Sequence, residues 1–430
     1  MSTKPQISRH AAEFPSHEVG SDEIFFSVTD DAGVITHVNS VFERLARSSR
    51  EELIGSPHNI IRHPDMPGGV FKLMWDDLQS DAPFAGYVRN LARDNSTYDV
   101  MATVTPLPSG GYLSVRTRPV TENFDTAAKV YYEANDLEAW VKGEGKNRRE
   151  AAALGAEKIL EIVGTYRDFM YAIVPAELQA LEEQGLCLPE GEGELYESVV
   201  ALYNELDSFM GVQSAIADAT QQMQEAGRAL EAENEATARV KEEMESVVVD
   251  GVERTLLLAP LGVWSTMRGI IDEHVADLGE LASQLADAGA EARFAIALAR
   301  LHTAVTARFV AEEGHEEAIG LLIEALDVDI ESMHRAVSTH ARLARRVDMK
   351  VGSIGRIMEV PHSLIKEWDA TDQTELAPGV GDLVREVQRA MKAAEVSYEQ
   401  LQASSQNIGG DVDPARVDEA IDRVKKLADN

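Results

Sequence analysis

The stretch of sequence that decides the fold is Asn-Ile-Ile-Arg-His-Pro-Asp-Met, at residues 59–66. Upstream of it, the β-prone runs Ile24–Val28 and Val34–Val38 flank Asp31-Ala32-Gly33, a hairpin signal in which glycine can take a positive φ. Directly after it, Pro67–Leu78 carries apolar side chains at helical spacing. The sequence therefore predicts a β-hairpin followed by a short helical segment.

Three further β-prone runs complete this part of the chain. They are Gly86–Ala92, Tyr98–Thr105 and Tyr112–Arg118, separated by Asp94-Asn95-Ser96 and by Pro108-Ser109-Gly110-Gly111. Ser48–Glu52 predicts a helix start, because a hydroxyl cap precedes acidic residues. The predicted order of two strands, short helices and three strands gives an α+β domain with a five-stranded antiparallel sheet. We expect a ligand pocket between the helices and the inner face of this sheet.

Several motifs in this segment together match a known family. They are Val28-Thr29-Asp30, Gly33–Asn39 (Gly-Val-Ile-Thr-His-Val-Asn), Ser49–Gly55 (Ser-Arg-Glu-Glu-Leu-Ile-Gly), Pro57–Pro67 and Ser114–Pro119 (Ser-Val-Arg-Thr-Arg-Pro). On these motifs, Asp22–Pro119 resembles the PAS domain of the bacterial aerotaxis receptor family, over about a quarter of the chain. The resemblance implies a PAS fold and a role in sensing redox state or oxygen.

The same resemblance implies a flavin site that holds FAD without a covalent bond. Carried over residue by residue, the candidate cofactor-binding residues are Asn39, Arg62, His63, Asp65 and Trp75. Arg62 would pair with the diphosphate as a fork donor, and Trp75 would pack on the ring system. Asn39 and His63 would donate to ring heteroatoms. The family often has tryptophan at the position of Phe84, so the aromatic lining is thinner here.

Other interpretations of these residues stay open at this point. Arg62 and Asp65 can instead clip a turn that Pro64 and Pro67 fix, and His63 can be a haem ligand or a buried hydrogen-bond partner. Trp75 lies on the apolar face of its helix and is a core residue in either case. The domain can hold FAD, haem, another small ligand or no cofactor.

After Pro119 the β-strand signals stop and helical spacing begins. We expect connecting helices at Asn123–Trp140 and Arg148–Ile173, with breaks at Gly143-Glu144-Gly145 and Val174-Pro175, and a loop at Gly185–Glu194. Beyond the loop, apolar residues recur in alternating threes and fours over 216–247, 278–292 and 326–358. A repeat that averages 3.5 residues predicts a coiled-coil or helical-bundle region.

These patterns divide the chain into five predicted parts. They are an N-terminal extension at 1–20, the PAS sensory domain at 21–120, connecting helices and a loop at 121–190, a long antiparallel helical region at 191–375 and C-terminal helices at 376–430. Pro260 and Gly262 predict a bend of the long region near 255–269, as in the hairpin of methyl-accepting chemotaxis receptors. The tip motif by which that family docks a kinase and an adaptor is absent, so a chemotaxis kinase or adaptor is expected only if coupling survives without it.

Composition narrows the function classes further. The 430 residues contain 40 Lys plus Arg and 74 Asp plus Glu, a net charge of −34, which disfavours nucleic acid and anionic lipid as partners. No run approaches eighteen consecutive apolar residues, and the single cysteine, Cys187, fits a reducing compartment. We expect a cytoplasmic protein without a membrane span.

The histidines lack the spacing of a metal site, and no catalytic motif is present, so no catalytic or metal-binding residue is predicted. The leading hypothesis is a flavin-dependent sensor-transducer, not an enzyme, that signals by rearranging a helical bundle. The alternative is a PAS and coiled-coil interaction scaffold without cofactor. A homodimer or higher homo-oligomer is expected in both cases.

Overall fold

The computed structural model describes residues 15–247, 257–312, 316–366, 379–408 and 414–428 of the chain. It divides into two compact units. The first unit comprises residues 1–210, 293–334 and 413–430, and the second comprises residues 211–292 and 335–412.

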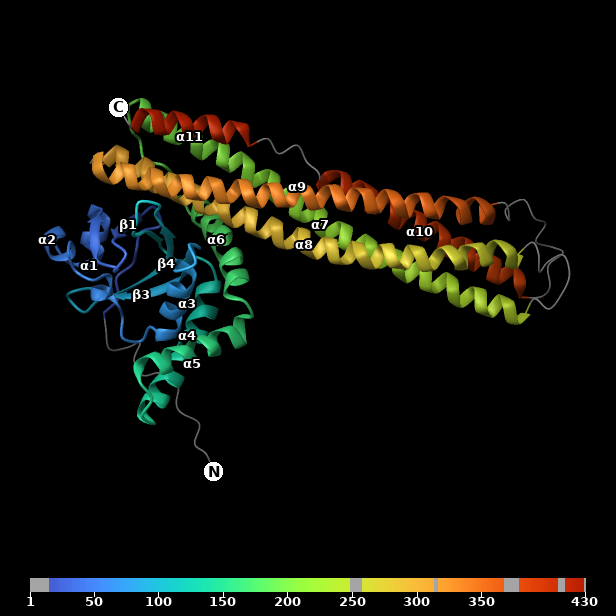
Figure 1. Ribbon diagram of the computed structural model, residues 1–430, viewed down its shortest axis with the longest axis horizontal. Coiled ribbons are helices and arrows are strands. Elements are labelled where there is room, and N and C mark those ends of the chain that lie inside the picture. The colour runs from blue at the N-terminus through green and yellow to red at the C-terminus, as the bar shows by residue number, and fades with distance from the viewer. Residues whose placement is uncertain (1–14, 248–256, 313–315, 367–378, 409–413, 429–430) are drawn as a thin grey trace. The chain divides into compact units, whose positions relative to one another are not determined.

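The first unit contains a five-stranded antiparallel sheet in the order β2-β1-β5-β4-β3 (Figure 1). The strands are β1 Ile24–Thr29, β2 Ile35–Val38, β3 Phe84–Leu91, β4 Thr97–Pro106 and β5 Tyr112–Thr117. Between β2 and β3 lie α1 Ser40–Ala46, α2 Arg50–Leu53, the 3₁₀ helix η2 His58–Ile61 and α3 Gly68–Leu78. The predicted fold, a five-stranded antiparallel sheet with short helices followed by a mainly helical region, is confirmed.

Local hydrogen bonds set the positions of the β1–β2 turn and of the start of α2, as the sequence predicts. In the β1–β2 turn, Gly33 has a φ of 76°, and the carboxylate of Asp30 accepts the backbone N–H groups of Ala32 and Val34 at 2.9 Å. Ser49 and Glu52 form a capping box at the start of α2. The turn and the cap position the chain that leads into the cavity-lining segment.

Three helices follow the sheet: α4 Asn123–Gly143, α5 Arg148–Val163 and α6 Tyr166–Glu183. Helix α5 packs on α3 and α4, and α6 contacts β3. The single helix expected over Arg148–Ile173 is wrong, because the chain breaks at Gly164, which has a φ of 78°. The expected break at Pro175 is also wrong. Pro175 lies inside α6, where the surrounding packing overrides its tendency to end a helix.

Five more helices make up the rest of the described chain. They are α7 Glu194–Val247, α8 Ala259–Glu312, α9 Glu316–Lys366, α10 Val380–Ile408 and α11 Ala415–Ala428. In the first unit, the ring of Phe26 on β1 meets Phe309 on α8 edge-on at 5.3 Å, and the Ser109 hydroxyl donates to Glu324 on α9 at 2.6 Å. Helix α8 thus contacts β1, and α9 contacts the turn between β4 and β5.

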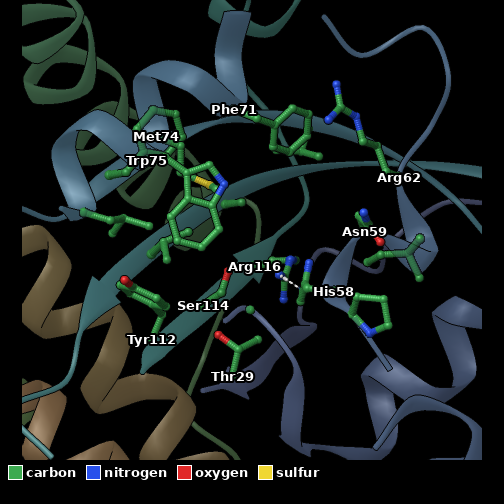
Figure 2. A pocket seen from close by; sticks show the side chains of 18 of the residues that line it. Thr29, His58, Asn59, Arg62, Phe71, Met74, Trp75, Tyr112, Ser114 and Arg116 are labelled. Carbon is green, nitrogen blue, oxygen red and sulfur yellow. Dashed lines mark hydrogen bonds between the residues drawn. The ribbon is translucent and has the colours of Figure 1, made fainter. Parts of the chain in front are cut away.

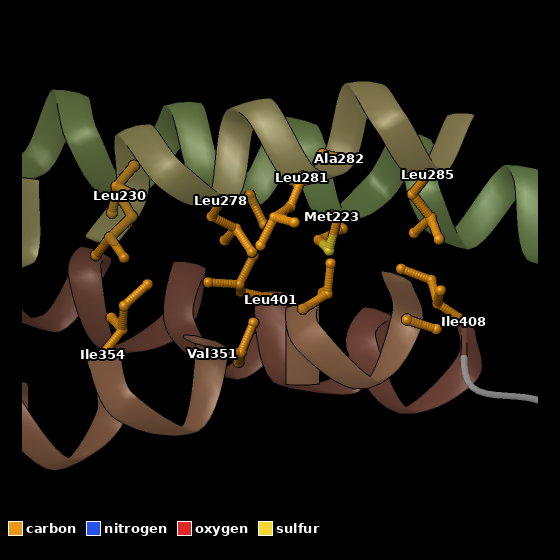
Figure 3. Packing of buried hydrophobic residues seen from close by; sticks show 14 of the residues in the cluster. Met223, Leu230, Leu278, Leu281, Ala282, Leu285, Val351, Ile354, Leu401 and Ile408 are labelled. Atoms are coloured by element: carbon orange, nitrogen blue, oxygen red, sulfur yellow. The ribbon is translucent and has the colours of Figure 1, made fainter. Parts of the chain in front are cut away.

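The second unit is a bundle whose core is shared by α7, α8, α9 and α10 (Figure 3). Its buried residues include Met223 and Leu230 from α7, Leu278 and Leu285 from α8, Val351 and Ile354 from α9, and Leu401 and Ile408 from α10. Most of the seam residues expected from the sequence are therefore buried within one chain, whereas Val247, at the end of the first repeat, is 41% exposed. Residues of 376–430 belong to this core, which differs from the predicted separation of the C-terminal helices.

Helix α7 ends at Val247 and α8 begins at Ala259, so one long helix is followed by the next close to the start of the bend expected near 255–269. Pro260 and Gly262 do not themselves break a helix. Both residues lie inside α8, close to its beginning at Ala259, where proline is tolerated because the first turn needs no N–H donor. Residues 255 and 256 of the predicted bend, and the predicted boundary at 375, fall outside the described residues.

Helix α8 is also apolar enough and long enough to resemble a membrane span. Its most apolar 18-residue window has a mean hydropathy of 1.3, and it is the one such helix among the described residues. Within the protein, 83% of this window is buried. This burial is the pattern of a core helix.

Candidate functional site

A cavity of about 240 Å³ lies between α3 and the inner face of the sheet (Figure 2). Its apolar walls come from α3, β3 and β4, through Phe71, Met74, Leu78, Phe84, Val88, Ala102 and Val104. Its polar lining comes from His58, Asn59, Arg62, Asn90, Ser114 and Arg116. A mostly apolar cavity with a few convergent polar groups is typical of a cofactor or small-molecule site.

Arg116 of β5 places a buried positive charge at this cavity. The residue is 4% exposed; its Nη1 donates to the Ser27 hydroxyl at 3.2 Å, and its Nη2 lies 2.6 Å from Nε2 of His58. The guanidinium also lies 5.8 and 5.4 Å from the ring centres of Phe25 and Phe42. Within the described parts of the chain, Arg116 has no carboxylate partner.

The pKa values of this pair follow from its surroundings. Burial lowers the pKa of Arg116 to about 10, so the guanidinium still carries its charge at neutral pH. Burial and the charge of Arg116 hold the pKa of His58 well below its ordinary value of 6.5. His58 is therefore neutral, and its Nε2 accepts from Arg116. The buried cation has only neutral partners, so a ligand that brings negative charge would be stabilised there.

Asn90 of β3 adds a second polar group that lacks a partner. Its side chain lines the cavity, the residue is 2% exposed, and its Nδ2 has no hydrogen-bond acceptor among the described residues. Leaving a buried donor unsatisfied is unfavourable by about 1–3 kcal/mol. An acceptor atom on a bound molecule would remove this penalty.

Aromatic side chains form another part of the cavity wall. Trp75 on α3 meets Tyr112 edge-on, with their ring centres 5.5 Å apart (Figure 2). Gly33 packs beside the indole, at a distance where a Cβ on Gly33 would be in ordinary van der Waals contact with it at 3.7 Å. The guanidinium carbon of Arg62 lies 3.9 Å above the centre of the Phe71 ring. These rings offer flat apolar surfaces to a planar ligand.

Two of the five predicted site residues line the cavity, namely Arg62 and Trp75. Arg62 donates to the backbone carbonyl of Met66 at 3.0 Å. The alternative in which Arg62 clips the turn through Asp65 is therefore not the arrangement seen, because the turn is closed through a backbone oxygen.

The other three predicted residues do not line the cavity. Asn39 caps α1 by accepting the N–H of Phe42 at 3.2 Å. His63 is 2% exposed and accepts the N–H of Asp65 through Nδ1 at 3.1 Å. The side chains of Asn39 and His63 therefore have hydrogen-bond partners within the fold. The carboxylate of Asp65 lies 3.8 Å from Nδ1 of His63, and its buried Oδ2 has no hydrogen-bond partner among the described residues.

The polar cavity residues that were missed from the sequence include His58, Asn90 and Arg116. The signal for Arg116 lies in β5, where Tyr112, Ser114 and Arg116 alternate with Leu113 and Val115. Alternation puts the polar set on one face, and both neighbours of β5 are strands, so a charged residue there is buried. A charge on a central strand is a sign of function that the sequence contained.

Helix α3, which carries the aromatic wall, is held by a carboxylate from α4. Glu138 is 1% exposed and accepts the N–H groups of Gly68 and Gly69 at 2.9 and 2.7 Å. It thereby caps the N-terminus of α3, where the positive end of the helix dipole favours an anion. A Cβ on Gly69 would overlap the backbone of Gly155 and Ala156, so α3 and α5 are in close contact.

A second buried carboxylate ties α6 to the end of the sheet. Glu177 is 0% exposed and accepts the Tyr87 hydroxyl at 2.6 Å, the N–H of Val120 at 2.7 Å and the N–H of Thr121 at 3.2 Å. Burial and the hydrogen bond to Glu177 raise the pKa of Tyr87, so Tyr87 remains a donor. The cavity domain is therefore connected to the helices through two buried glutamates.

Comparisons with known proteins agree with this geometry. Residues 23–117 match the family model of the PAS fold. The aerotaxis receptor of Escherichia coli strain K12 is 32% identical over 139 residues, which is 31% of this chain and 26% of the receptor. The chain thus spans about a quarter of the length of that relative.

Two solved structures are also similar. The PAS domain of a protein from Colwellia psychrerythraea has 23% identity, covers 22% of this chain and 85% of its own, and has a TM-score of 0.20. The blue-light activated histidine kinase EL346 of Erythrobacter litoralis has 11% identity, covers 44% of this chain and 58% of its own, and has a TM-score of 0.23.

Proposed function

We propose that this chain, whose residues 23–117 are a PAS domain of the aerotaxis-receptor type, is a redox or oxygen sensor-transducer that holds a flavin, FAD, in the cavity. The observation that carries the proposal is the buried Arg116 at the cavity, whose partners His58 and Ser27 are both neutral. A bound flavin supplies reversible electron transfer, which changes the charge on its ring.

The lining residues fit such a group. A cavity of about 240 Å³ is smaller than the usual ~300–1,000 Å³ of drug-sized sites, so it suits a planar ring system better than a whole dinucleotide. Asn90 offers a buried donor, and Trp75 offers a flat apolar wall. Arg62 is half-buried and donates to one backbone carbonyl, which leaves donors for a diphosphate.

The charge at Arg116 provides the sensing step. When negative charge appears beside it, the guanidinium is stabilised and its hydrogen bond to His58 weakens or shifts. His58 belongs to η2, and the chain leads from there to α3, which Glu138 ties to α4. A change at the cavity thus reaches the helices through contacts that already exist. The helical bundle would then change between two packings of similar energy.

The location, the oligomer and the output partner are part of the same proposal. We place the protein in the cytoplasm, as a homodimer or higher homo-oligomer, with a chemotaxis kinase or adaptor as the downstream partner. Haem is a weaker alternative, because His63, its proposed ligand, does not line the cavity. A cofactor-free scaffold is the second candidate, and it leaves the uncompensated Arg116 without an explanation.

The test is the absorption spectrum of the purified full chain, before and after dithionite. We expect flavin bands that bleach on reduction, and release of FAD on denaturation. Trp75→Leu should release flavin, whereas Trp140→Leu, at a tryptophan on α4 that is 64% exposed, should not. A Soret band would identify haem instead. A colourless protein that also fails to bind added FAD would refute the proposal in favour of the scaffold.

A further inference from the structure

The second unit carries a row of arginines on the outer face of α9, which we call the basic stripe: Arg342, Arg345, Arg346 and Arg356. All four are exposed, and Met349 among them is 64% exposed. Arg342, Arg345 and Arg346 have no carboxylate partner in the described part of the chain, and Arg356 donates to the Ser353 hydroxyl at 3.0 Å. In a chain with a net charge of −34, this stripe reverses the prevailing charge.

Helix α8 carries the opposite pattern on its outer face, which we call the acidic stripe: Glu273, Glu280 and Asp287. These residues are exposed and lie seven residues apart, so they share one face of the helix. Glu280 accepts from Gln284 at 3.2 Å, and none of the three has a cationic partner among the described residues. Their neighbours Leu278, Leu281 and Leu285 are buried in the bundle core.

The relative height of the two stripes follows from an ion pair within the chain. Lys350 on α9 pairs with Asp277 on α8, and the two helices are antiparallel (Figure 1). Counting along both helices from this pair, Glu273, Glu280 and Asp287 are level with residues 354, 347 and 340. In each case the exposed residue of α9 lies two positions closer to the C-terminus than this level, at Arg356, Met349 and Arg342. Two positions correspond to about 3 Å along the helix.

If two copies of the bundle are related by a two-fold axis parallel to the helices, an attractive contact needs opposite charges at the same level on α8 and α9. Such an axis keeps every residue at its own level and brings α8 of one copy against α9 of the other, in both directions. Asp287 would then face Arg342, and Glu273 would face Arg356. Glu280 would face Met349, with Arg345 and Arg346 within one turn. At one end, Ile270 and Val360, which are 46% and 45% exposed, would meet.

We propose that the basic stripe of α9 binds the acidic stripe of α8 in a second copy of this chain, forming an isologous dimer through the second unit. The occupant is a second copy because its charge pattern matches in sign, spacing and level. Nucleic acid and anionic lipid are disfavoured by the net charge of −34. The inference does not depend on the cavity holding a flavin.

The test uses the full chain and two charge-reversed variants. One variant reverses the basic stripe (R342E, R346E, R356E), and the other reverses the acidic stripe (E273K, E280K, D287K). Each alone places like charges opposite each other. Mixed in equal amounts, the two variants are complementary at both contacts, so a heterodimer should form. The control is R228E with R239E, which reverses two exposed arginines on α7, outside both stripes.

Sedimentation velocity gives the association state, and circular dichroism checks that each variant is helical. Exposed ion pairs each contribute about two- to threefold, so six pairs in an isologous contact predict about a hundredfold rise in Kd for each variant. We expect the wild-type dimer to weaken with salt, the control to stay dimeric and the mixture to recover the dimer. A monomeric wild type at low salt, a dimer retained by both variants, or folded variants that fail to associate when mixed would overturn the proposal.

Discussion

Replacing the buried arginine by an apolar residue of similar length, Arg116→Met, is expected to stabilise the ligand-free protein. The pKa of Arg116 falls from 12.5 to about 10, which corresponds to an unfavourable term of about 3 kcal/mol for the buried cation. The rings of Phe25 and Phe42 offset about 1–2 kcal/mol of this by cation–π attraction. The variant should therefore gain about 1–2 kcal/mol in unfolding free energy.

Arg116→Met is expected to raise the unfolding free energy throughout the neutral pH range. Since the folded pKa of Arg116 lies below the unfolded value, the penalty is complete at every pH below about 10 and is relieved only as the pH rises above that value. A measurement near neutral pH therefore reports the whole effect. Removing the arginine also removes the charge that we propose for ligand binding, so the same variant should lose flavin.

A second arginine of the same sheet is the matched control. Arg89 on β3 donates to both carboxylate oxygens of Asp99, at 2.7 and 2.8 Å, and to the Tyr132 hydroxyl at 2.7 Å. Its hydrogen bond to Asp99 raises the pKa of Arg89. Arg89→Met would leave Asp99, which is about a quarter exposed, without its partner. We expect it to lose about 2 kcal/mol, the opposite sign to Arg116→Met.

Hydrogen exchange of the amides in β4 and β5, read by mass spectrometry on the flavin-free full chain, measures both effects in one experiment. Slower exchange in Arg116→Met and faster exchange in Arg89→Met are the expected results. If Arg116→Met instead exchanges faster, to the same extent as Arg89→Met, then Arg116 is a structural residue with adequate partners. The argument that the cavity awaits a negative charge would then fail.

Two further predictions concern the helix contact and the pH dependence. Glu138→Gln retains one acceptor for the two N–H groups of Gly68 and Gly69, so α3 should lose about 1–3 kcal/mol of local stability and exchange faster, and unchanged exchange in α3 would contradict the capping role. His58 has a folded pKa below 6.5, so the unfolded state takes up its proton first as the pH falls, and sheet stability should decline below about pH 6.5. Urea unfolding at several pH values should show a smaller decline in His58→Gln, and an equal decline in both proteins would rule out this source.

The sequence alone predicted the sheet and its hairpin well. Alternating apolar residues, Gly33 in the turn and the Ser49 cap are local signals, and local backbone and hydrogen-bond chemistry decided those elements. The position of the cavity followed from the order of the elements. Two cavity residues, Arg62 and Trp75, were found because they belong to a contiguous motif and its adjoining helix.

Only the tertiary structure decided which polar groups meet at the cavity and which helices share a core. Arg116 and His58 are 58 residues apart in the chain, so no local spacing joins them. Asn39, from another of the family motifs, instead caps α1 by accepting a hydrogen bond from its near neighbour Phe42. The heptad pattern of the long helices predicted that one face of each helix is buried, but not which helices pack against that face. Burial is non-directional, so any apolar face of similar period satisfies it, and the folded chain satisfies it with four of its own helices.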